Sequence, residues 1–252
     1  MSIEIITMWY NEEFLAPFFL NHYNYADQIT IILDSDTNDN TDSIIKQYNN
    51  AKIVNFKFPD MMDDELKSKA ITEQYKKSKC KWVLSVDADE FVFYKNNNNF
   101  IYNLNQYLKD DKSDLIRVAF YQVYKNVNDK NLDSSIETVP QRRHGDPNVF
   151  GNHNKLYIKP ILVKSGLQIE WNPGCHSLKT INHEISISND FLYGAHWAMA
   201  DEEFVFIRRI KNRRERQSKN NIAKRMTVQH HDVTVKSIMK EFELHYNDPK
   251  IF

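Results

Sequence analysis

The chain has 252 residues and a formal net charge of −1, and 41% of its residues are hydrophobic and 13% aromatic. This composition excludes a disordered chain, and no apolar run is long enough to span a bilayer. The two cysteines, Cys80 and Cys175, lie far apart without metal-ligand spacing, and we recognise no signal peptide. We therefore expect a reduced, cytoplasmic protein with a single folded domain over residues 1–252.

Apolar runs and helical patterns alternate through the first part of the chain. The runs predict strands over residues 3–8, 28–33, 53–58 and 82–86, with helices over about 12–25, from 41, and over about 63–78. Pro17 places the true start of the first helix near itself, and Thr41 can cap the second. Strands joined by helical crossovers predict a parallel sheet with helices on both of its faces.

The fourth predicted strand ends in a cluster of acids. Asp87, Asp89 and Glu90 follow the apolar run directly, at the kind of strand end where open α/β sheets bind ligands. In an extended chain Asp87 and Asp89 project to the same side and can share one divalent cation. The alternative is that these acids are solvated turn formers.

Glycine usage narrows the ways in which this sheet could hold phosphate. None of the five glycines precedes Gly145, and the chain contains neither GxGxxG nor GxxxxGK[ST]. A dinucleotide fingerprint and a P-loop are therefore excluded. A nucleotide bound here would need another device against its phosphate charge, and a cation on Asp87 and Asp89 is such a device.

The pattern is less regular after residue 93. We expect a helix over residues 100–108, a long strand over 115–124, and strands over 155–163, 167–171 and 184–188. No internal repeat or clean linker separates this part from the first. It is therefore expected to complete the same domain and to choose the substrate.

A strongly basic segment spans residues 207–226. Glu215 is its one acid, and its basic residues are Arg208, Arg209, Lys211, Arg213, Arg214, Arg216, Lys219, Lys224 and Arg225. Such a segment is either a solvated helix face or a surface for an anionic ligand, a lipid or a nucleic acid.

Three ordered blocks resemble the GT-A nucleotide-sugar glycosyltransferases of family 2. MWYNEEFLAPFFLNHY (8–23) is similar to the family's first strand and aromatic helix, and ILDSDTNDNT (32–41) to its acidic loop. KSKAITEQYKKSKCKWVLSVDADEF (67–91) resembles its basic helix and DxD strand. A looser block, LYGAHWAMADEEFVFIRRIKNRR (192–214), is similar to a His-aromatic pair before a late basic helix.

The resemblance implies a fold and a reaction. The fold is GT-A, an α/β domain with a mixed, mainly parallel sheet, in which residues 1–93 bind nucleotide, 94–200 face the acceptor and 201–252 form a C-terminal helical segment. The reaction is a metal-dependent, inverting transfer from a nucleotide-diphosphate sugar, with a UDP-sugar favoured, to a glycan or lipid-linked acceptor. Such a reaction belongs to surface polysaccharide or glycoconjugate synthesis.

The resemblance also assigns the donor site. Asp87 would lie near the ribose and reach a Mn²⁺ or Mg²⁺ ion, Asp89 would bind the ion directly, and His196 would be a third ligand, with His176 as its rival. The remaining donor contacts would come from Asn11, Glu12, Asp34, Asp36 and Lys69.

The late block supplies candidates for the remaining roles. An inverting transfer needs a carboxylate base, and Asp201, Glu202 and Glu203 are the candidates, although acids at a helix start also serve the helix dipole. Asp146 is the second choice for the base. The diphosphate would be clamped by Arg209, Arg213 or Arg214, and the other basic residues would rest on an anionic membrane face.

Two other functions stay open. The chain could be a nucleic-acid-binding module that uses the basic 207–226 helix, or a nucleotidyltransferase on the same fold. The sequence has no RNP, helix-turn-helix or zinc-finger pattern for the first, and lacks the glycine-rich first loop expected of the second.

Overall fold

The computed structural model describes residues 1–96, 99–146, 157–181, 184–226 and 232–251. Its first part is a parallel sheet in the order β3-β2-β1-β4. The strands are β1 (Ile3–Trp9), β2 (Gln28–Asp34), β3 (Ala51–Phe56) and β4 (Trp82–Ser85). β1, β2 and β4 are almost wholly buried, as parallel strands covered on both faces should be. Their carboxyl ends meet at one edge, where the candidate site lies.

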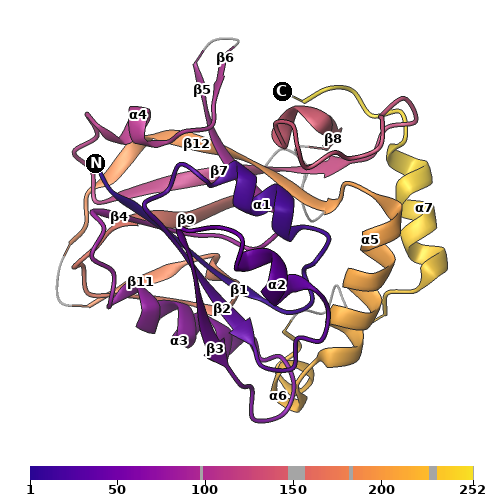
Figure 1. The fold of residues 1–252 in the computed structure, drawn as a ribbon, viewed down its shortest axis with the longest axis horizontal. Coiled ribbons are helices and arrows are strands. Elements are labelled where there is room, and N and C mark those ends of the chain that lie inside the picture. Colours follow the sequence, from indigo (N-terminus) through magenta and orange to yellow (C-terminus); the bar gives the residue numbers. More distant parts are fainter. Residues whose placement is uncertain (97–98, 147–156, 182–183, 227–231, 252) are drawn as a thin grey trace.

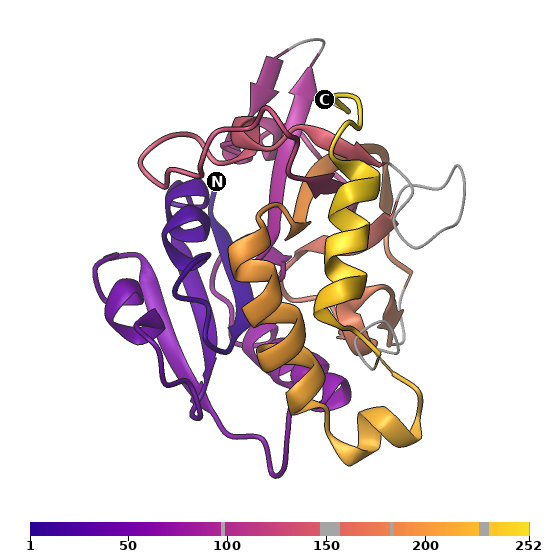
Figure 2. The same cartoon turned by 90° about the vertical axis from the view of Figure 1, so that its right-hand side faces the viewer.

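Three helices form the crossovers. They are α1 (Ala16–His22), α2 (Thr41–Ile45) and α3 (Asp64–Tyr75), with α1 and α2 on one face of the sheet and α3 on the other (Figure 2). Asp63 caps α3 by accepting the amides of Glu65 and Leu66, both at 3.0 Å. Thr41 does not cap α2, because it is the first helical residue and its hydroxyl instead accepts the Glu12 amide at 2.8 Å.

The second part of the chain extends the same sheet past β4, in the order β9-β7-β12-β5-β6, with β8 added on β7 (Figure 1). The elements are β5 (Glu90–Asn96), β6 (Asn99–Ile101), α4 (Asn105–Leu108), β7 (Leu115–Tyr124), η1 (Val139–Gln141), β8 (His144–Asp146), β9 (Tyr157–Lys164) and β12 (Ile187–Met199). A separate ribbon contains β10 (Ile169–Trp171), η2 (Pro173–Cys175) and β11 (Leu178–Thr180). The mixed α/β fold is confirmed, with its continuous parallel block confined to β3-β2-β1-β4.

Two expected elements in this part were wrong. The helix expected over residues 100–108 is reduced to α4, because residues 99–101 pair with β5 as β6. The strand expected over residues 184–188 is displaced by β12, which runs through Ile187–Met199 beside β7. The polar residues 188–190 interrupt the apolar pattern at the start of β12, and the apolar part of the strand follows them.

The start of β5 is fixed from α1. The Tyr23 hydroxyl donates to the Glu90 carbonyl at 2.8 Å and accepts the Val92 amide at 2.9 Å, and the His22 ring lies 2.9 Å from the Val92 carbonyl. Trp197 of β12 packs on Phe91 of the same strand. The turn between β4 and β5, which carries Asp87 and Asp89, is therefore held on its β5 side by buried contacts.

The C-terminal part continues from β12 as α5 (Glu202–Phe206), a π-helical stretch η3 (Ile207–Arg213), a 3₁₀ turn η4 (Arg214–Arg216), α6 (Lys219–Ala223) and α7 (Val235–His245). α5 and α7 lie side by side (Figures 1 and 2). The Met62 amide donates to the Arg216 carbonyl at 3.0 Å, and the Ser218 amide donates to the Met62 carbonyl at 3.1 Å. The basic segment is thereby tied to the loop before α3. Across the ranges described, no helix is both long and apolar enough to cross a membrane.

Candidate active site

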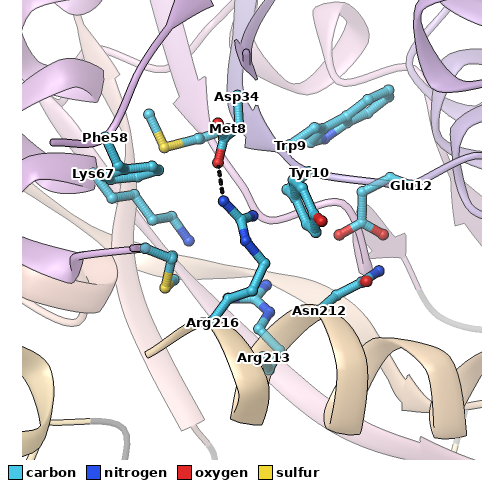
Figure 3. A pocket seen from close by; sticks show the side chains of 11 residues that line it. Met8, Trp9, Tyr10, Glu12, Asp34, Phe58, Lys67, Asn212, Arg213 and Arg216 are labelled. Atoms are coloured by element: carbon cyan, nitrogen blue, oxygen red, sulfur yellow. Dashed lines mark hydrogen bonds and ion pairs between the residues drawn. The ribbon is translucent and has the colours of Figure 1, made fainter. Parts of the chain in front are cut away.

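A pocket opens at the carboxyl edge of β1 and β2, with the basic segment as its opposite wall (Figure 3). It encloses about 420 Å³, part of which is open to solvent. Its lining residues are Met8, Trp9, Tyr10, Glu12, Asp34, Phe58, Met62, Lys67, Asn212, Arg213 and Arg216. The pocket thus combines aromatic and thioether surface with a few charged groups, as small-ligand sites do.

Asp34, Tyr10 and Arg216 meet within the pocket (Figure 3). The Arg216 Nη2 donates to Asp34 Oδ2 at 2.8 Å, and the guanidinium carbon lies 3.4 Å from the centre of the Tyr10 ring. Arg216 Nη1 is buried and has no hydrogen-bond partner within the described ranges. These three side chains offer a planar stacking surface, a carboxylate acceptor and a spare donor. A nucleobase and a ribose require groups of these kinds.

Asp87 is held by two lysines of the sheet and its flanking helix. Lys67 Nζ of α3 lies 2.5 Å from Asp87 Oδ1, and Lys159 Nζ of β9 lies 3.6 Å from Asp87 Oδ2. Lys159 also pairs with Glu90 Oε1 at 2.5 Å. Burial alone would raise the pKa of Asp87, but Lys67 and Lys159 hold the pKa of this carboxyl well below its usual range. Asp87 is therefore an ionised carboxylate whose charge is balanced by the two ammonium groups.

Asp89 belongs to a different group of side chains. Its Oδ2 pairs with Arg208 Nη1 and lies 3.3 Å from His196 Nε2, while Arg208 Nε donates to the two carboxylate oxygens of Glu12 at 3.1 and 3.2 Å. Burial opposes ionisation of Asp89, but Arg208 and then His196 hold its pKa well below the ordinary value. Burial raises the pKa of Glu12, which shares its one guanidinium with Asp89.

Asp89 and His196 together could hold a divalent cation, and Asp87 is engaged by two lysines. Mg²⁺ and Mn²⁺ are commonly held by one or two side chains together with substrate phosphates, and an oxygen and an imidazole nitrogen meet here. His196 Nδ1 is buried without a partner in the described part of the chain, so the ring is not committed elsewhere. Both oxygens of Asp87 face ammonium groups, and no cluster of three or more His, Cys, Asp or Glu side chains exists among the described residues.

The rival histidine lies near Glu90 and Asp87. His176 follows η2, and its ring lies close to Gly174, where a Cβ atom would come within 2.6 Å of His176 Nε2. Burial lowers the pKa of His176, while the charges of Glu90 and Asp87 act in the opposite direction. His176 therefore faces the Asp87 group, and His196 is the histidine beside Asp89.

Several expected donor contacts lie outside the pocket. Asn11 uses its side chain to pair with Asn38, at 2.8 and 2.9 Å, and Asp36 pairs with Lys57 on the surface. Lys69 is exposed, whereas Lys67 is buried and lines the pocket. Successive residues of an α-helix turn by 100°, so Lys69 points about 200° away from Lys67 and cannot share its face.

The carboxylates proposed as a base cap α5. Asp201 Oδ1 accepts the Glu203 amide at 3.0 Å, and its Oδ2 lies 3.6 Å from Arg142 Nη2. Glu202 accepts the hydroxyl of Tyr246, and Glu203 is exposed. None of the three lines the pocket. Asp146 is the last residue of β8, and its side chain lies outside the described part.

The basic segment turns a different set of arginines toward the site than expected. Arg213 lines the pocket, but Arg209 pairs with Glu241 at 2.7 Å and Arg214 donates to the Val233 carbonyl at 2.7 Å. Sequence reasoning missed Arg208 and Arg216. Their four-residue spacing with Asn212, at 208, 212 and 216, is the signal that one buried helix face would have given.

Comparison with known proteins gives one family and several distant structures. A search of curated proteins finds no match. The solved structures that the search returned include S. aureus TarS, with 17% identity over 96% of this chain and 43% of that chain at a TM-score of 0.43. The 1–349 form of S. aureus TarS in complex with UDP-GlcNAc has 15% identity over 96% of this chain and 72% of that chain, at a TM-score of 0.45.

A third structure is glucosyl-3-phosphoglycerate synthase from Mycobacterium tuberculosis with Mn²⁺, UDP and phosphoglyceric acid. It has 14% identity over 48% of this chain and 43% of that chain, at a TM-score of 0.33. This chain thus spans less than half the length of that synthase and of the TarS chain. The model for glycosyl transferase family 2 matches residues 4–166, which is more than half of the sequence. The chain therefore belongs to glycosyl transferase family 2.

Proposed function

We propose that the pocket binds a nucleoside diphosphate-sugar, with a UDP-sugar favoured, and that the sugar is transferred to a glycan or lipid-linked acceptor. The observation that carries this proposal is the pocket itself. It brings a stacking surface and a carboxylate, Tyr10 and Asp34, together with the cations Lys67 and Arg213, and Lys67 connects it to the DAD turn through Asp87. These groups suit a base, a ribose and a diphosphate.

The cations define the reaction that the pocket can support. Transfer of a sugar leaves negative charge on the departing nucleoside diphosphate, and fixed cations stabilise that charge most when they are buried. Lys67 is buried and already oriented by Asp87, while Arg213 approaches from the C-terminal segment. We assign the diphosphate to these two side chains and retain Asp34 and Glu12 as the donor-site carboxylates.

We further propose that the enzyme depends on a divalent cation held by Asp89 and His196. When bound, Mn²⁺ or Mg²⁺ supplies Lewis-acid stabilisation to the leaving diphosphate. In the free enzyme Arg208, itself bound to Glu12, pairs with Asp89 Oδ2, the oxygen that faces His196. Asp87 keeps its place near the donor through Lys67 and is not assigned to the ion.

The acceptor side is proposed from the fold and the resemblance. Residues 94–200 would bind the acceptor and Asp201, Glu202 or Glu203 would take its proton in an inverting transfer within polysaccharide or glycoconjugate synthesis. Of these acids Glu203 is the exposed one. Four cations on the outer side of the basic segment are exposed and would rest on an anionic membrane, namely Lys211, Lys219, Lys224 and Arg225.

The structure favours this function over nucleic-acid binding. Much of the positive charge in the basic segment is turned inward, because Arg208 pairs with Asp89, Arg209 with Glu241, and Arg216 with Asp34. A nucleic-acid surface requires such charges to be available to phosphates outside the protein.

Turnover of a panel of UDP-, GDP- and dTDP-sugars, with Mn²⁺ or with EDTA, tests the proposal. We expect hydrolysis or transfer with UDP-sugars, dependence on Mn²⁺, and loss of activity in Asp89→Ala. Exposed Lys219→Gln is the matched control and should leave turnover unchanged. Full activity in EDTA would remove the metal from the mechanism, and no turnover of any nucleotide sugar would overturn the function.

A further inference from the structure

Arg208 occupies the centre of a buried ionic group that joins three distant parts of the chain. Its guanidinium lies between Glu12 from the loop after β1 and Asp89 from the turn after β4. Arg208, Glu12 and Asp89 are only 7%, 6% and 2% exposed. Buried ions of this kind stay together because each would be unstable alone. The Asp89 carboxylate, which also faces His196, is therefore already paired with Arg208.

The three nitrogen atoms of this guanidinium differ in their partners. Arg208 Nε is shared between both oxygens of Glu12, Nη1 pairs with Asp89, and Nη2 is buried with no hydrogen-bond partner in the described ranges. A buried donor without an acceptor is unfavourable, and a phosphate oxygen is an acceptor that a guanidinium binds well. The Nε contact with Glu12 can persist while the Nη groups change partners.

Charge explains when that change would occur. A divalent ion arriving alone at Asp89 would place two cations on one buried carboxylate, and their repulsion in a poorly screened site is large. A diphosphate arriving with the ion removes this conflict, because it offers Arg208 new anionic oxygens. The ion and the nucleotide would then each favour the binding of the other.

We propose that Arg208 is an exchangeable counter-ion that couples divalent-cation binding to nucleotide binding. In the free enzyme it neutralises Asp89, and in the donor complex it turns toward the diphosphate and leaves Asp89 and His196 to the ion. This inference rests on the proposed function: phosphate oxygens that bind the ion already couple the two ligands, and Arg208 adds a separate contribution to that coupling. Such a coupling is reciprocal, so it can be measured from either ligand.

Mn²⁺ binding without turnover tests the coupling. Free Mn²⁺ is followed by electron paramagnetic resonance with and without saturating UDP, in the wild type, Arg208→Gln, Arg208→Lys and the control Lys211→Gln. Lys211 is an exposed cation on the same helical stretch, so its change removes equal charge without touching Asp89. We expect Arg208→Gln to bind Mn²⁺ alone about tenfold more tightly than the wild type, and UDP to improve its Mn²⁺ affinity by a correspondingly smaller factor than in the wild type.

The other variants show whether the change in Mn²⁺ binding is specific to Arg208. UDP should tighten Mn²⁺ binding by about tenfold or more in the wild type and in Lys211→Gln, with Arg208→Lys between them and Arg208→Gln. The coupling is overturned if folded Arg208→Gln binds Mn²⁺ alone no more tightly than the control. If circular dichroism shows that this variant is unfolded, Arg208→Lys decides, and wild-type behaviour in that variant also overturns the coupling. Sugar transfer with unaltered Mn²⁺ binding would reject the coupling and leave the proposed function intact.

Discussion

Asp87 and Asp89 stand two residues apart in one turn, and the protein surrounds them with different parts of the chain. Asp87 is held by Lys67 from α3 and Lys159 from β9, which belong to the sheet and its covering helix. Asp89 is held by Arg208, which arrives from the C-terminal segment. The first carboxylate is built into the framework, whereas the second depends on an element that reaches the site from the end of the chain.

The different partners of Asp87 and Asp89 suit the two carboxylates to different roles. Lysines anchored in regular elements give Asp87 a fixed orientation, so it can align a donor but cannot readily change partners. The counter-ion of Asp89 lies on a π-helical stretch, and irregular turns of this kind are frequent at functional sites. The carboxylate with the replaceable partner is the one suited to receive a cation.

Asp89→Asn is expected to have the largest effect. The amide keeps the shape but removes the charge that Arg208 and the proposed ion share, so sugar transfer should fall by about 10²–10³-fold. Mn²⁺ affinity should fall with it. Asp87→Asn is the matched variant, and it should retain Mn²⁺ binding while weakening nucleotide binding. Equal loss of Mn²⁺ binding in both variants would contradict the division of roles.

Lys159→Met should be the next largest, and its effect is on stability. Lys159 and Glu90 are 3% and 1% exposed, so the change leaves a buried carboxylate without its ammonium partner. The free energy of unfolding should drop by about 3 kcal/mol in urea titrations. Lys164→Met is the control, because its ion pair with Asp114 is partly exposed, and it should change stability by less than about 1 kcal/mol. Similar losses in both would show that the Asp87 group is not a buried framework.

The framework around Asp87 was largely predictable from sequence. Strands β1, β2 and β4 are mostly apolar, and the acids at or after their ends, Glu12, Asp34 and Asp87, mark the edge of the sheet without any tertiary information. The spacing of Asp87 and Asp89 predicted a shared ion, but not that Lys67 and Lys159 would claim Asp87. Lys159 lies 72 residues beyond Asp87, and no local pattern connects the two.

The surroundings of Asp89 could be predicted only in part. His196 was identified from the late block, and the structure brings it within 3.3 Å of Asp89. The sequence points to Arg209 and not to Arg208, because a basic run does not reveal which side of a helix is buried until its packing partner is known. The change of helical pitch in η3 further alters the residues that face inward.

The third effect, smaller than the first two, is the loss of stability in acid. The pKa values of both lie well below the ordinary value, so both stay ionised between pH 7 and 5. Burial lowers the pKa of His22 from 6.5 to about 4, so this ring stays neutral when folded but gains a proton when unfolded. Unfolding is therefore favoured as the pH falls, and the His22 contribution to stability should be about 2 kcal/mol smaller at pH 5 than at pH 7.

Urea unfolding of the wild type and His22→Gln at both pH values measures this contribution. The variant lacks the titrating ring, so its loss of stability between pH 7 and 5 should be smaller by that amount. An equal loss in the two proteins would place the acid sensitivity in a group other than His22.

The smallest expected effect separates the two lysines of α3. Lys67 pairs with Asp87 and lines the pocket, while Lys69 is exposed on another face of the helix. Lys67→Gln should weaken UDP binding by about tenfold, equivalent to about 1.4 kcal/mol, and Lys69→Gln by less than about twofold. Isothermal titration calorimetry with UDP, in EDTA and then with Mn²⁺, measures both. Because Lys67 acts from the Asp87 side, its loss should weaken UDP binding to the same degree in either condition. A loss seen only with Mn²⁺ would instead connect Lys67 to Asp89 and join the two groups into one site.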